Sequence, residues 1–461
     1  MAKIKTLIES GFYFFIILLP WQTRLIWQDA SLNGYVWEYG RFSLYGTELL
    51  LWLILFCYGF WLIKTRHLVR LNFNQFIQQL KKPAALIYWL IVLFFIIAGW
   101  SVVWSLDREL AYYSWFRLLA AGAMLSLILT FKFSFKKIAA SWVAGAAIQG
   151  VFASWQFFSQ YVFANKWLGL AEHLPTVPGA IILQTDSERW LRAYGSLPHP
   201  NILAGFLVIA VLFLLYLAFI AEKASQRVFV LVGLVAIIPA LFFSFSRSAW
   251  LALIFSLVVL GFWLWRHKNY FWQSSFFKIL FLILIMVGVL GGSLYQPLLT
   301  RITGEQDLEA ASIELRLAFT KQALELIKAD WLWGQGIGNY TLAVWQKIDA
   351  SWPGYYYQPV HNIYLLISAE LGIFGALAFG LILILLIWFL ITTKAEGANR
   401  QSRLNEAGDS RLSLEKIIIF LCLSSILIIG LFDHYFWTLY FGVMIFWLIV
   451  GLNLKLLKSA D

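Results

Sequence analysis

The sequence predicts an all-α protein that crosses a membrane about twelve times. Of its 461 residues, 61% are hydrophobic and only 13% are charged, and the mean hydropathy is +0.76. A water-soluble fold has too little interior to hide this much apolar surface. Helices are expected because they satisfy their own backbone hydrogen bonds within the hydrocarbon. We therefore expect a single membrane domain over residues 1–461.

Apolar runs give the positions of the expected helices. A helix needs about 20 apolar residues to cross the hydrocarbon core. Twelve runs reach or approach this length: 7–27, 45–63, 85–104, 112–130, 138–158, 201–220, 228–245, 248–265, 279–295, 362–391, 417–431 and 435–453. The first run follows two lysines, but no small-x-small cleavage site follows it. We therefore interpret it as a retained helix and not as a signal peptide.

Basic residues orient these helices. Every second connection is basic and nearly free of acids; the residues concerned are Lys3, Lys5, Lys64, Arg66, Arg70, Lys81, Lys82, Lys132, Lys136, Lys137, Arg266, Lys268 and Lys278. Such connections stay on the cytoplasmic side, so both termini should be cytoplasmic. The net charge of +11 then reflects orientation and attraction to anionic lipid, and no nucleic-acid partner is needed to explain it.

Three connections are long enough to carry structure of their own. The segments 159–200 and 296–360 fall on the outer side, whereas 392–416 is cytoplasmic and has the mixed composition of a flexible linker. Because the longest non-membrane segments face outward, we expect the chemistry on that side. In 296–360, an apolar stripe at helical spacing predicts an amphipathic helix across the mouth of the bundle. Arg316 lies beside that stripe and either points into the bundle or remains a surface arginine.

A glycine-rich turn follows the amphipathic helix. It reads Gly334-x-Gly336-x-Gly338-Asn339-Tyr340, with neither the lysine of a nucleotide P-loop nor a preceding strand. Glycines permit either a sharp turn or a close approach to a ligand. The pattern leaves both interpretations open.

Two other segments predicted on the outer side contain an arginine close to the start of a helix. The segment from Arg192 to Asn201 includes His199 and Pro200, and Pro-Asn is a plausible helix start that would favour a nearby anion. Arg247 stands in a turn so short that it must lie at the membrane surface, where an arginine needs a partner or a wet cavity. Its guanidinium can bind phosphate oxygens in a bidentate way.

His361 and Asn362 open the helix that begins the next span, at the outer membrane face. The predicted topology brings Arg192, Arg247 and Arg316 to the same face. A cluster of arginines with a candidate base suits a substrate that has a phosphate or pyrophosphate head and a lipid tail. Each residue also has a structural interpretation, as an interfacial anchor or a helix cap.

The remaining polar residues are less informative. Arg117 and Glu48 fall near outer helix ends, where they pair with each other or contact substrate. Nothing distinguishes the Asp433-His434 turn from an ordinary loop. No cluster of His, Cys and carboxylate has metal-ligand spacing, so we expect neither a metal nor a cofactor.

In order and sidedness, these motifs resemble the bacterial O-antigen ligase and polymerase superfamily. The resemblance covers the topology of the whole chain and, in motif, the segment from Arg192 to Gly375. Its motifs are Arg-x-x-Gly-x-x-x-His-Pro-Asn ending at Asn201, Ser-x-Ser-Arg-Ser around Arg247, a loop-helix Arg316, Gly-x-Gly-x-Gly-Asn-Tyr ending at Tyr340, and His-Asn-x-x-Leu from His361. No single motif is specific, but their combination is.

The resemblance implies a glycosyltransferase with a GT-C-like bundle in the bacterial cytoplasmic membrane. Members of the superfamily take a glycan from undecaprenyl pyrophosphate at the outer leaflet. Carried over, Arg192 and Arg247 would hold the pyrophosphate and His361 would act on the acceptor hydroxyl, inverting the anomeric centre without a metal. The other expected substrate contacts are Arg316, His199, Asn201, Asn339, Tyr340, Asn362 and Arg117.

Several acceptors and one other class of protein stay open. The late loop looks most similar to that of ligases, which pass the glycan to a glycolipid, but polymerases extend a glycan and relatives glycosylate proteins. A flippase for lipid-linked oligosaccharides would also need arginines for pyrophosphate. Against a flippase, the two halves of the chain show no clear internal repeat.

Overall fold

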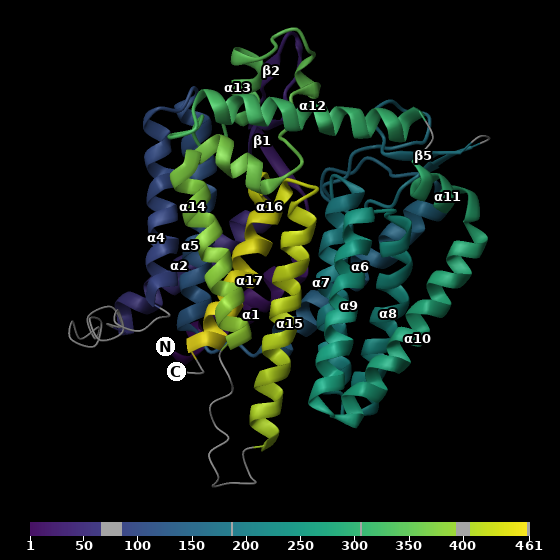
Figure 1. Ribbon diagram of the computed structural model, residues 1–461. Helices are drawn as coiled ribbons and strands as arrows, with labels where there is room; N and C mark the ends of the chain where they lie inside the picture. Colours follow the sequence, from purple (N-terminus) through teal and green to yellow (C-terminus); the bar gives the residue numbers. More distant parts are fainter. Residues whose placement is uncertain (66–84, 186–187, 305–306, 393–405, 459–461) are drawn as a thin grey trace.

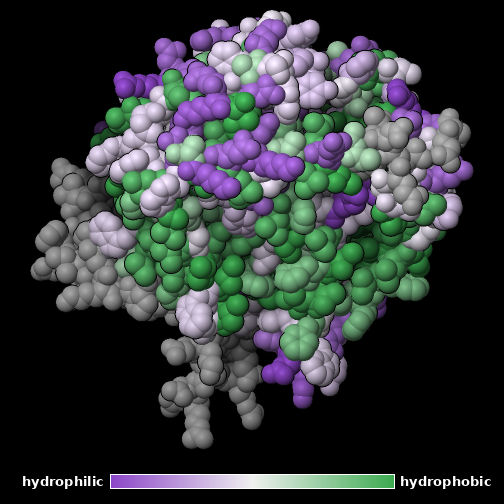
Figure 2. Space-filling model, turned by 45° about the horizontal axis from the view of Figure 1, so that its top comes forward, coloured by the Kyte–Doolittle hydropathy of each residue, from purple (hydrophilic) through white to green (hydrophobic). Residues whose placement is uncertain are grey.

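In the computed structural model, residues 1–65, 85–185, 188–304, 307–392 and 406–458 are described, and they form one helical bundle (Figure 1). Within these residues, eleven helices are long and apolar enough to span a membrane. The predicted all-α, multi-span class is therefore confirmed. Figure 2 shows hydrophobic side chains around the body of the bundle and hydrophilic ones gathered over the end that α12 crosses.

The spanning helices follow the apolar runs. Their bounds are α2 (Gly46–Thr65), α4 (Ala85–Trp100), α5 (Arg108–Thr130), α6 (Phe135–Ser159), α7 (Pro200–Phe219), α8 (Ala224–Phe243), α9 (Arg247–His267), α10 (Tyr270–Ser293), α14 (Ile363–Thr392), α15 (Glu406–Gly430) and α17 (Tyr440–Lys458). The short η2 (Ser101–Val103) continues α4. A further helix, α1 (Ala2–Leu18), has 17 residues and packs against α2 and α6. With it, each of the predicted runs has a helical counterpart.

The first run ends as a helix earlier than predicted. It was expected to be helical to residue 27, but α1 ends at Leu18 and β1 (Arg24–Gln28) follows. Pro20 stands two residues beyond the helix and lacks the N–H that would continue the helical hydrogen bonds. Hydropathy does not separate an apolar strand from an apolar helix, so the run alone gave no sign of this boundary.

The chain between α1 and α2 forms a β-structure that the apolar pattern did not reveal. We call residues 24–45 the hairpin. In it, β1 pairs antiparallel with β4 (Phe42–Tyr45), and β2 (Ser31–Leu32) pairs with β3 (Tyr35–Val36); η1 (Glu38–Gly40) lies between β3 and β4. Asn33 and Gly34 both have positive φ at the β2–β3 turn, which is the usual Asn-Gly signal of a tight hairpin. The Asn33 amide donates to the carbonyls of Ala350 and Trp352, each over 2.6 Å, and ties this turn to the large loop.

The most buried spanning helices are α7 and α17, in each of which 94% of an 18-residue apolar stretch is buried inside the molecule. By contrast, only 17% of such a stretch is buried in α10, which lies at the edge of the bundle (Figure 1). α1 begins and α17 ends at the end of the bundle opposite α12 (Figure 1). The segment 393–405 of the predicted cytoplasmic linker lies outside the described residues, and α15 already begins at Glu406.

The two segments predicted to lie on the outer side contain helices and strands of their own. Residues 160–199 include the paired strands β5 (Ile182–Gln184) and β6 (Arg189–Leu191). The larger segment contains α11 (Tyr295–Thr303), α12 (Asp307–Ala329), α13 (Tyr340–Lys347) and η3 (Gly354–Tyr356), and α16 (Tyr435–Thr438) precedes α17. α12 lies across the end of the bundle (Figure 1). Its residues Phe319, Ala323 and Leu326 are buried, so the second half of the apolar stripe faces inward, whereas Leu315 in the first half is exposed.

The glycine-rich turn docks into a break in α14. Gly372 has a φ of 63°, which interrupts the helical hydrogen bonds of α14. The backbone N–H groups of Gln335 and Gly336 donate to Ala369 and Glu370, at 2.9 and 2.8 Å, and use the carbonyls that the break frees. Gly336 has a φ of 91°, and a Cβ there would collide with Ser105. These glycines therefore turn the chain and let it pack closely against α14 and Ser105.

Candidate active site

A cavity of about 610 Å³ lies where α7, α9, α12 and α14 meet near the α12 end of the bundle. Arg247, Arg301 and Arg316 line it, and none of the described residues that line it is acidic. The rest of its wall is largely apolar and includes Leu251, Leu317, Leu365, Leu431 and Phe432. We call it the arginine cavity. Guanidinium groups from three elements on one wall make it suited to an anionic group.

A strained turn positions Arg247 at the start of α9. Phe245, fully buried, has a φ of 48°, in the left-handed region that a bulky residue rarely adopts. Two arginines hold this turn: Nε of Arg192 donates to the carbonyl of Ser244, and Nε of Arg301 donates to the carbonyl of Phe245, both over 2.7 Å. Charged donors on consecutive carbonyls offset the cost of the turn.

Arg192 therefore occupies a different place from the one predicted. It is 4% exposed, lines neither large cavity, and also donates over 2.7 Å to Oδ1 of Asn201. It stands behind the turn and fixes the position of Arg247. Arg301, which sequence reasoning missed, has a place on the cavity wall. Only the docking of α11 against the turn brings Arg301 there, and no local motif signals that contact.

His361 lies between the arginine cavity and a second cavity of about 530 Å³ that the hairpin closes on one side. We call the second one the hairpin cavity. Among the described residues, His361 is the one that lines both cavities. Its ring stacks on Phe319 at 5.9 Å between centroids and 7° between planes. Its buried Nδ1 has no hydrogen-bond partner among the described residues.

Asn362 fixes the backbone beside His361. Its Oδ1 accepts hydrogen bonds from the N–H groups of Tyr364 and Leu365, at 2.9 and 3.0 Å, and so caps α14. Its Nδ2 donates to the carbonyl of Leu431 over 3.3 Å. Asn362 lines the arginine cavity, as predicted for a substrate contact, but both ends of its amide already have protein partners.

The Asp433-His434 turn, from which the sequence gave no signal, stands beside His361. The His434 ring meets the His361 ring edge-on at 5.1 Å. Asp433 accepts a hydrogen bond from Nδ2 of Asn201 over 3.4 Å and one from its neighbour's N–H over 2.9 Å. A chain of polar contacts thus runs from Arg192 through Asn201 to Asp433. An alignment of relatives would have been needed to single out this turn from sequence.

The surroundings keep His361 neutral. Burial lowers the pKa of His361 below its usual range, the neighbouring His434 and Arg316 lower it further, and Asp433 opposes them. Burial acts to raise the pKa of Asp433, but His434, His361, His199 and Arg316 outweigh it and leave that pKa below its ordinary value. A neutral imidazole next to a carboxylate can accept a proton and have the resulting charge stabilised.

Residues 232–380 match the family model described as O-antigen ligase. This match confirms the resemblance to the O-antigen ligase and polymerase superfamily. The matched segment runs from α8 to α14 and includes Arg247, Arg301, Arg316 and His361. No curated protein matches the chain. The O-antigen ligase family match supports a glycosyltransferase-like membrane enzyme. The matched residues include all three arginines that line the arginine cavity.

The O-antigen ligase match leaves Arg192, His199, Asn201 and the Asp433-His434 turn outside its bounds. Asn201 lines the arginine cavity and His199 lines the hairpin cavity. Nδ1 of His199 accepts the N–H of Asn201 over 3.0 Å at the start of α7, so this nitrogen carries no proton. The two residues predicted to contact substrate from this motif are thus divided between the two cavities.

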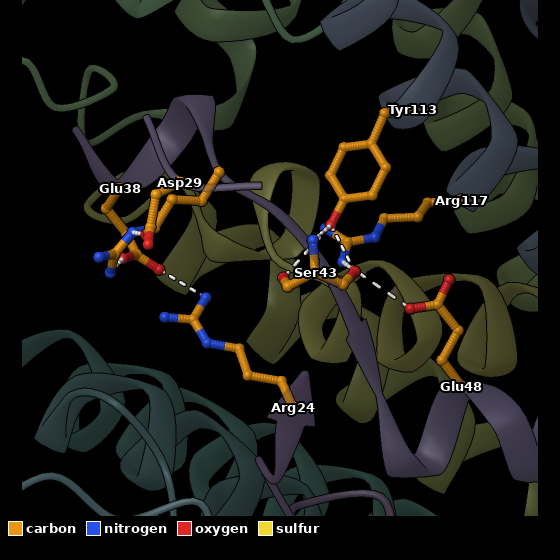
Figure 3. A network of polar contacts seen from close by, with 8 residues as sticks. Arg24, Asp29, Glu38, Ser43, Glu48, Tyr113 and Arg117 are labelled. Atoms are coloured by element: carbon orange, nitrogen blue, oxygen red, sulfur yellow. Dashed lines mark hydrogen bonds and ion pairs between the residues drawn. The ribbon is translucent and has the colours of Figure 1, made fainter. Parts of the chain in front are cut away.

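The other predicted substrate contacts lie away from His361. Both ends of the Asn339 amide bond the backbone of Asp107, at 2.8 and 3.1 Å, so Asn339 anchors the glycine-rich turn of the O-antigen ligase segment. The Tyr340 hydroxyl donates to the carbonyl of Phe319 over 3.2 Å and so holds the ring on which His361 stacks. Arg117 donates over 3.0 Å to the carbonyl of Ser43 and lies 3.8 Å from Glu48 (Figure 3).

Proposed function

We propose that the chain is an inverting, metal-independent glycosyltransferase that moves a glycan from undecaprenyl pyrophosphate to an acceptor hydroxyl at the outer face of the bacterial cytoplasmic membrane. The most similar known activity is that of an O-antigen ligase. The observation that carries the proposal is the place of His361, which lines the arginine cavity on one side and the hairpin cavity on the other. A transferase needs this relation between a donor, a base and an acceptor.

The arginine cavity fits a lipid pyrophosphate. Arg247, Arg301 and Arg316 line it, and guanidinium groups donate to phosphate oxygens. Leu251, Leu317 and Leu431 line the same cavity and are each about half exposed, at 50%, 59% and 48%. An apolar opening of this kind lets a polyprenyl chain remain in the hydrocarbon while its head reaches the arginines.

The reaction is a single displacement. The acceptor oxygen attacks the anomeric carbon, the bond from that carbon to the pyrophosphate oxygen breaks, and the lipid pyrophosphate leaves with the bonding electron pair. The arginines stabilise the negative charge as it develops. Neutral His361 takes the hydroxyl proton, and Asp433 stabilises the imidazolium that forms. Attack from the face opposite the leaving group inverts the anomeric centre.

The orientation proposed from the basic connections is consistent with this site. Lys132, Lys136 and Lys137 lie in or beside the connection from α5 to α6, and Arg266 lies at the end of α9 far from Arg247. These basic residues belong to the end of the bundle opposite α12, so the positive-inside rule supports an outer position for the cavities. A flippase would need its site to open to each side in turn, whereas both cavities lie at the α12 end.

Release of undecaprenyl pyrophosphate tests the proposal. Purified protein in lipid is given a lipid-linked glycan with a glycolipid, a glycan or a protein as acceptor. We expect release only with a suitable acceptor, and a product whose anomeric configuration is opposite to that of the donor. Transport of the glycolipid across the bilayer without bond cleavage would contradict the proposal and indicate a flippase. The acceptor that works separates ligase, polymerase and protein glycosylation.

A further inference from the structure

We infer that Glu370 is a positioning residue for the proposed reaction, and that its carboxylate holds the Asp433-His434 turn against His361. The inference rests on the proposed function and adds to it a residue outside both large cavities. Glu370 is 3% exposed and lines neither the arginine cavity nor the hairpin cavity. It lies in α14, which begins two residues after His361. Its effect on the reaction must therefore pass through other residues.

The backbone of Glu370 already belongs to the contact between α14 and the glycine-rich turn. Gly372, two residues further on, has a φ of 63° and breaks the helix. The carbonyl of Glu370 accepts the N–H of Gly336 over 2.8 Å. This bond brings the turn alongside α14, so that the N–H groups after Gly336 come close to the Glu370 side chain.

The residues after Gly336 form a concavity that suits an anion. Gly338 has a φ of 73° and Asn339 a φ of −99°. Backbone of alternating hand turns successive N–H groups to one side, where they attract negative charge. The N–H groups of Gly338 and Tyr340 interact as hydrogen-bond donors with the Glu370 carboxylate. Tyr340 begins α13, and the first N–H groups of a helix have no partner within it. The glycine-rich turn thus binds a carboxylate of the chain itself.

A third donor to the carboxylate comes from α16. Nε1 of Trp437 donates to Oε2 of Glu370 over 2.7 Å. Trp437 lies in α16, which packs beside α14 and begins directly after His434 (Figure 1). The N–H of Trp437 donates to the carbonyl of His434 over 3.0 Å, and Nδ1 of His434 lies 2.8 Å from Oγ1 of Thr438. Glu370 therefore holds His434 in place through Trp437.

This arrangement fixes two groups that act on His361. The His434 ring meets the His361 ring edge-on at 5.1 Å, and Asp433 precedes His434 in the chain. His361 leads into α14, whereas Asp433 and His434 lead into α16. The bond from Trp437 to Glu370 joins these two helices. Catalytic groups lose much of their effect when they move by about 1 Å, so we expect this bond to influence the rate.

The partners of Glu370 suit a carboxylate. Two backbone N–H groups and one indole N–H act on it as donors. A carboxylate only accepts hydrogen bonds, whereas the amide of glutamine has the same shape but donates from one of its two ends. In Glu370→Gln, the negative charge is lost and the NH₂ end finds only donors among these partners. This substitution weakens the contact without leaving a cavity.

Kinetics of two variants tests the inference on the purified full-length protein in lipid. In Glu370→Gln, we expect kcat to fall about tenfold with the KM for the lipid-linked glycan unchanged, because the arginine cavity is untouched. Trp437→Phe should act in the same way and, combined with Glu370→Gln, should add little further loss, because both remove one contact. Glu325→Gln, an exposed change on α12, is the matched control and should leave both constants unchanged. Trp437→Phe leaves the backbone donors in place, so it remains informative if Glu370→Gln fails to fold.

Histidine signals give a measurement that a loss of stability alone would not move. The chain has six histidines, so NMR of isotope-labelled histidine gives few signals, and His361→Ala and His434→Ala assign two of them. We expect both signals to shift in Glu370→Gln and in Trp437→Phe. The signal of His267, at the end of α9 far from Arg247, should stay in place.

The two measurements separate this inference from the proposed function. Unshifted His361 and His434 signals, or a wild-type kcat in both variants, would overturn the inference and leave the proposed function standing. Absence of glycan transfer by the wild type would instead contradict the proposed function. The histidine signals need no turnover and would still decide whether Glu370 positions the Asp433-His434 turn.

Discussion

Arg192 donates a 2.7 Å hydrogen bond to the side-chain oxygen of Asn201; Arg192 is buried behind the arginine cavity, whereas Asn201 lines it. The same guanidinium donates to the carbonyl of Ser244, which lies three residues before Arg247. One buried arginine thus connects the first outer segment, the start of α7 and the start of α9. We interpret Arg192 as a positioning residue for Arg247 and not as a direct pyrophosphate contact.

A double-mutant cycle tests this interpretation. Arg192→Lys keeps the charge but loses the planar pair of donors, so we expect a fall in kcat of at least about tenfold. Added to Arg247→Ala, it should cause little further loss, because Arg192 acts through Arg247. The measurement is the transfer rate of the four proteins. Losses that multiply would show that Arg192 contributes independently of Arg247.

Arg247 should act on the lipid donor. Arg247→Ala removes a bidentate donor from the cavity wall, and we expect the affinity for undecaprenyl pyrophosphate to fall by about 10- to 100-fold. Arg266→Ala, at the other end of α9, is the matched control and should leave the affinity unchanged. Equal affinities for the wild type and Arg247→Ala would show that Arg247 does not bind the lipid pyrophosphate in the arginine cavity.

The pH dependence of transfer should respond in opposite directions to two substitutions. The proposed reaction needs neutral His361, so we expect kcat/KM to fall as the pH drops through the pKa of this residue. Arg316 lowers that pKa, so Arg316→Gln should move the acid limb to higher pH; Asp433 raises it, so Asp433→Asn should move the limb to lower pH. Lys321→Gln, an exposed change on the same helix, should move nothing. Shifts of the same sign for Arg316→Gln and Asp433→Asn would contradict the assignment of His361 as the base.

Tyr340 should support the reaction from outside both large cavities. Tyr340→Phe removes the hydrogen bond to the carbonyl of Phe319 and so loosens the ring against which His361 stacks. We expect a loss of stability of about 0.5–1.5 kcal/mol and a fall in kcat of several-fold with KM little changed. Thermal unfolding and steady-state kinetics measure the two effects. A change in KM alone would indicate a direct substrate contact.

The glycine-rich turn should be sensitive to substitution for structural reasons. Gly336→Ala introduces a methyl group that collides with Ser105 at a backbone φ of 91°, and we expect it to destabilise by more than about 1 kcal/mol. Gly288→Ala is the control, because nothing lies within 4 Å of its added methyl group. Thermal unfolding of the two variants gives the comparison. Equal midpoints would show that the turn tolerates a side chain and has room for a ligand.

Hydropathy predicted the spans because it separates residues in the hydrocarbon from those in water. Basic connections then predicted which helix ends share one side of the membrane. Sidedness brought Arg247, Arg316 and His361 together correctly, and all three line the arginine cavity. It could not separate a residue on a cavity wall from one behind it, which is why Arg192 was expected at the substrate and Arg301 was missed. The hairpin was missed because its apolar strand continued the first hydrophobic run, although Asn33 and Gly34 carried a turn signal.

The most direct test of the central claim is a comparison of donor binding with single-turnover transfer in His361→Ala. We expect the variant to bind the lipid-linked glycan with wild-type affinity but to transfer it at least about 100-fold more slowly. His267→Ala, at the end of α9 far from Arg247, should behave like the wild type. Transfer by His361→Ala at the wild-type rate would contradict the account.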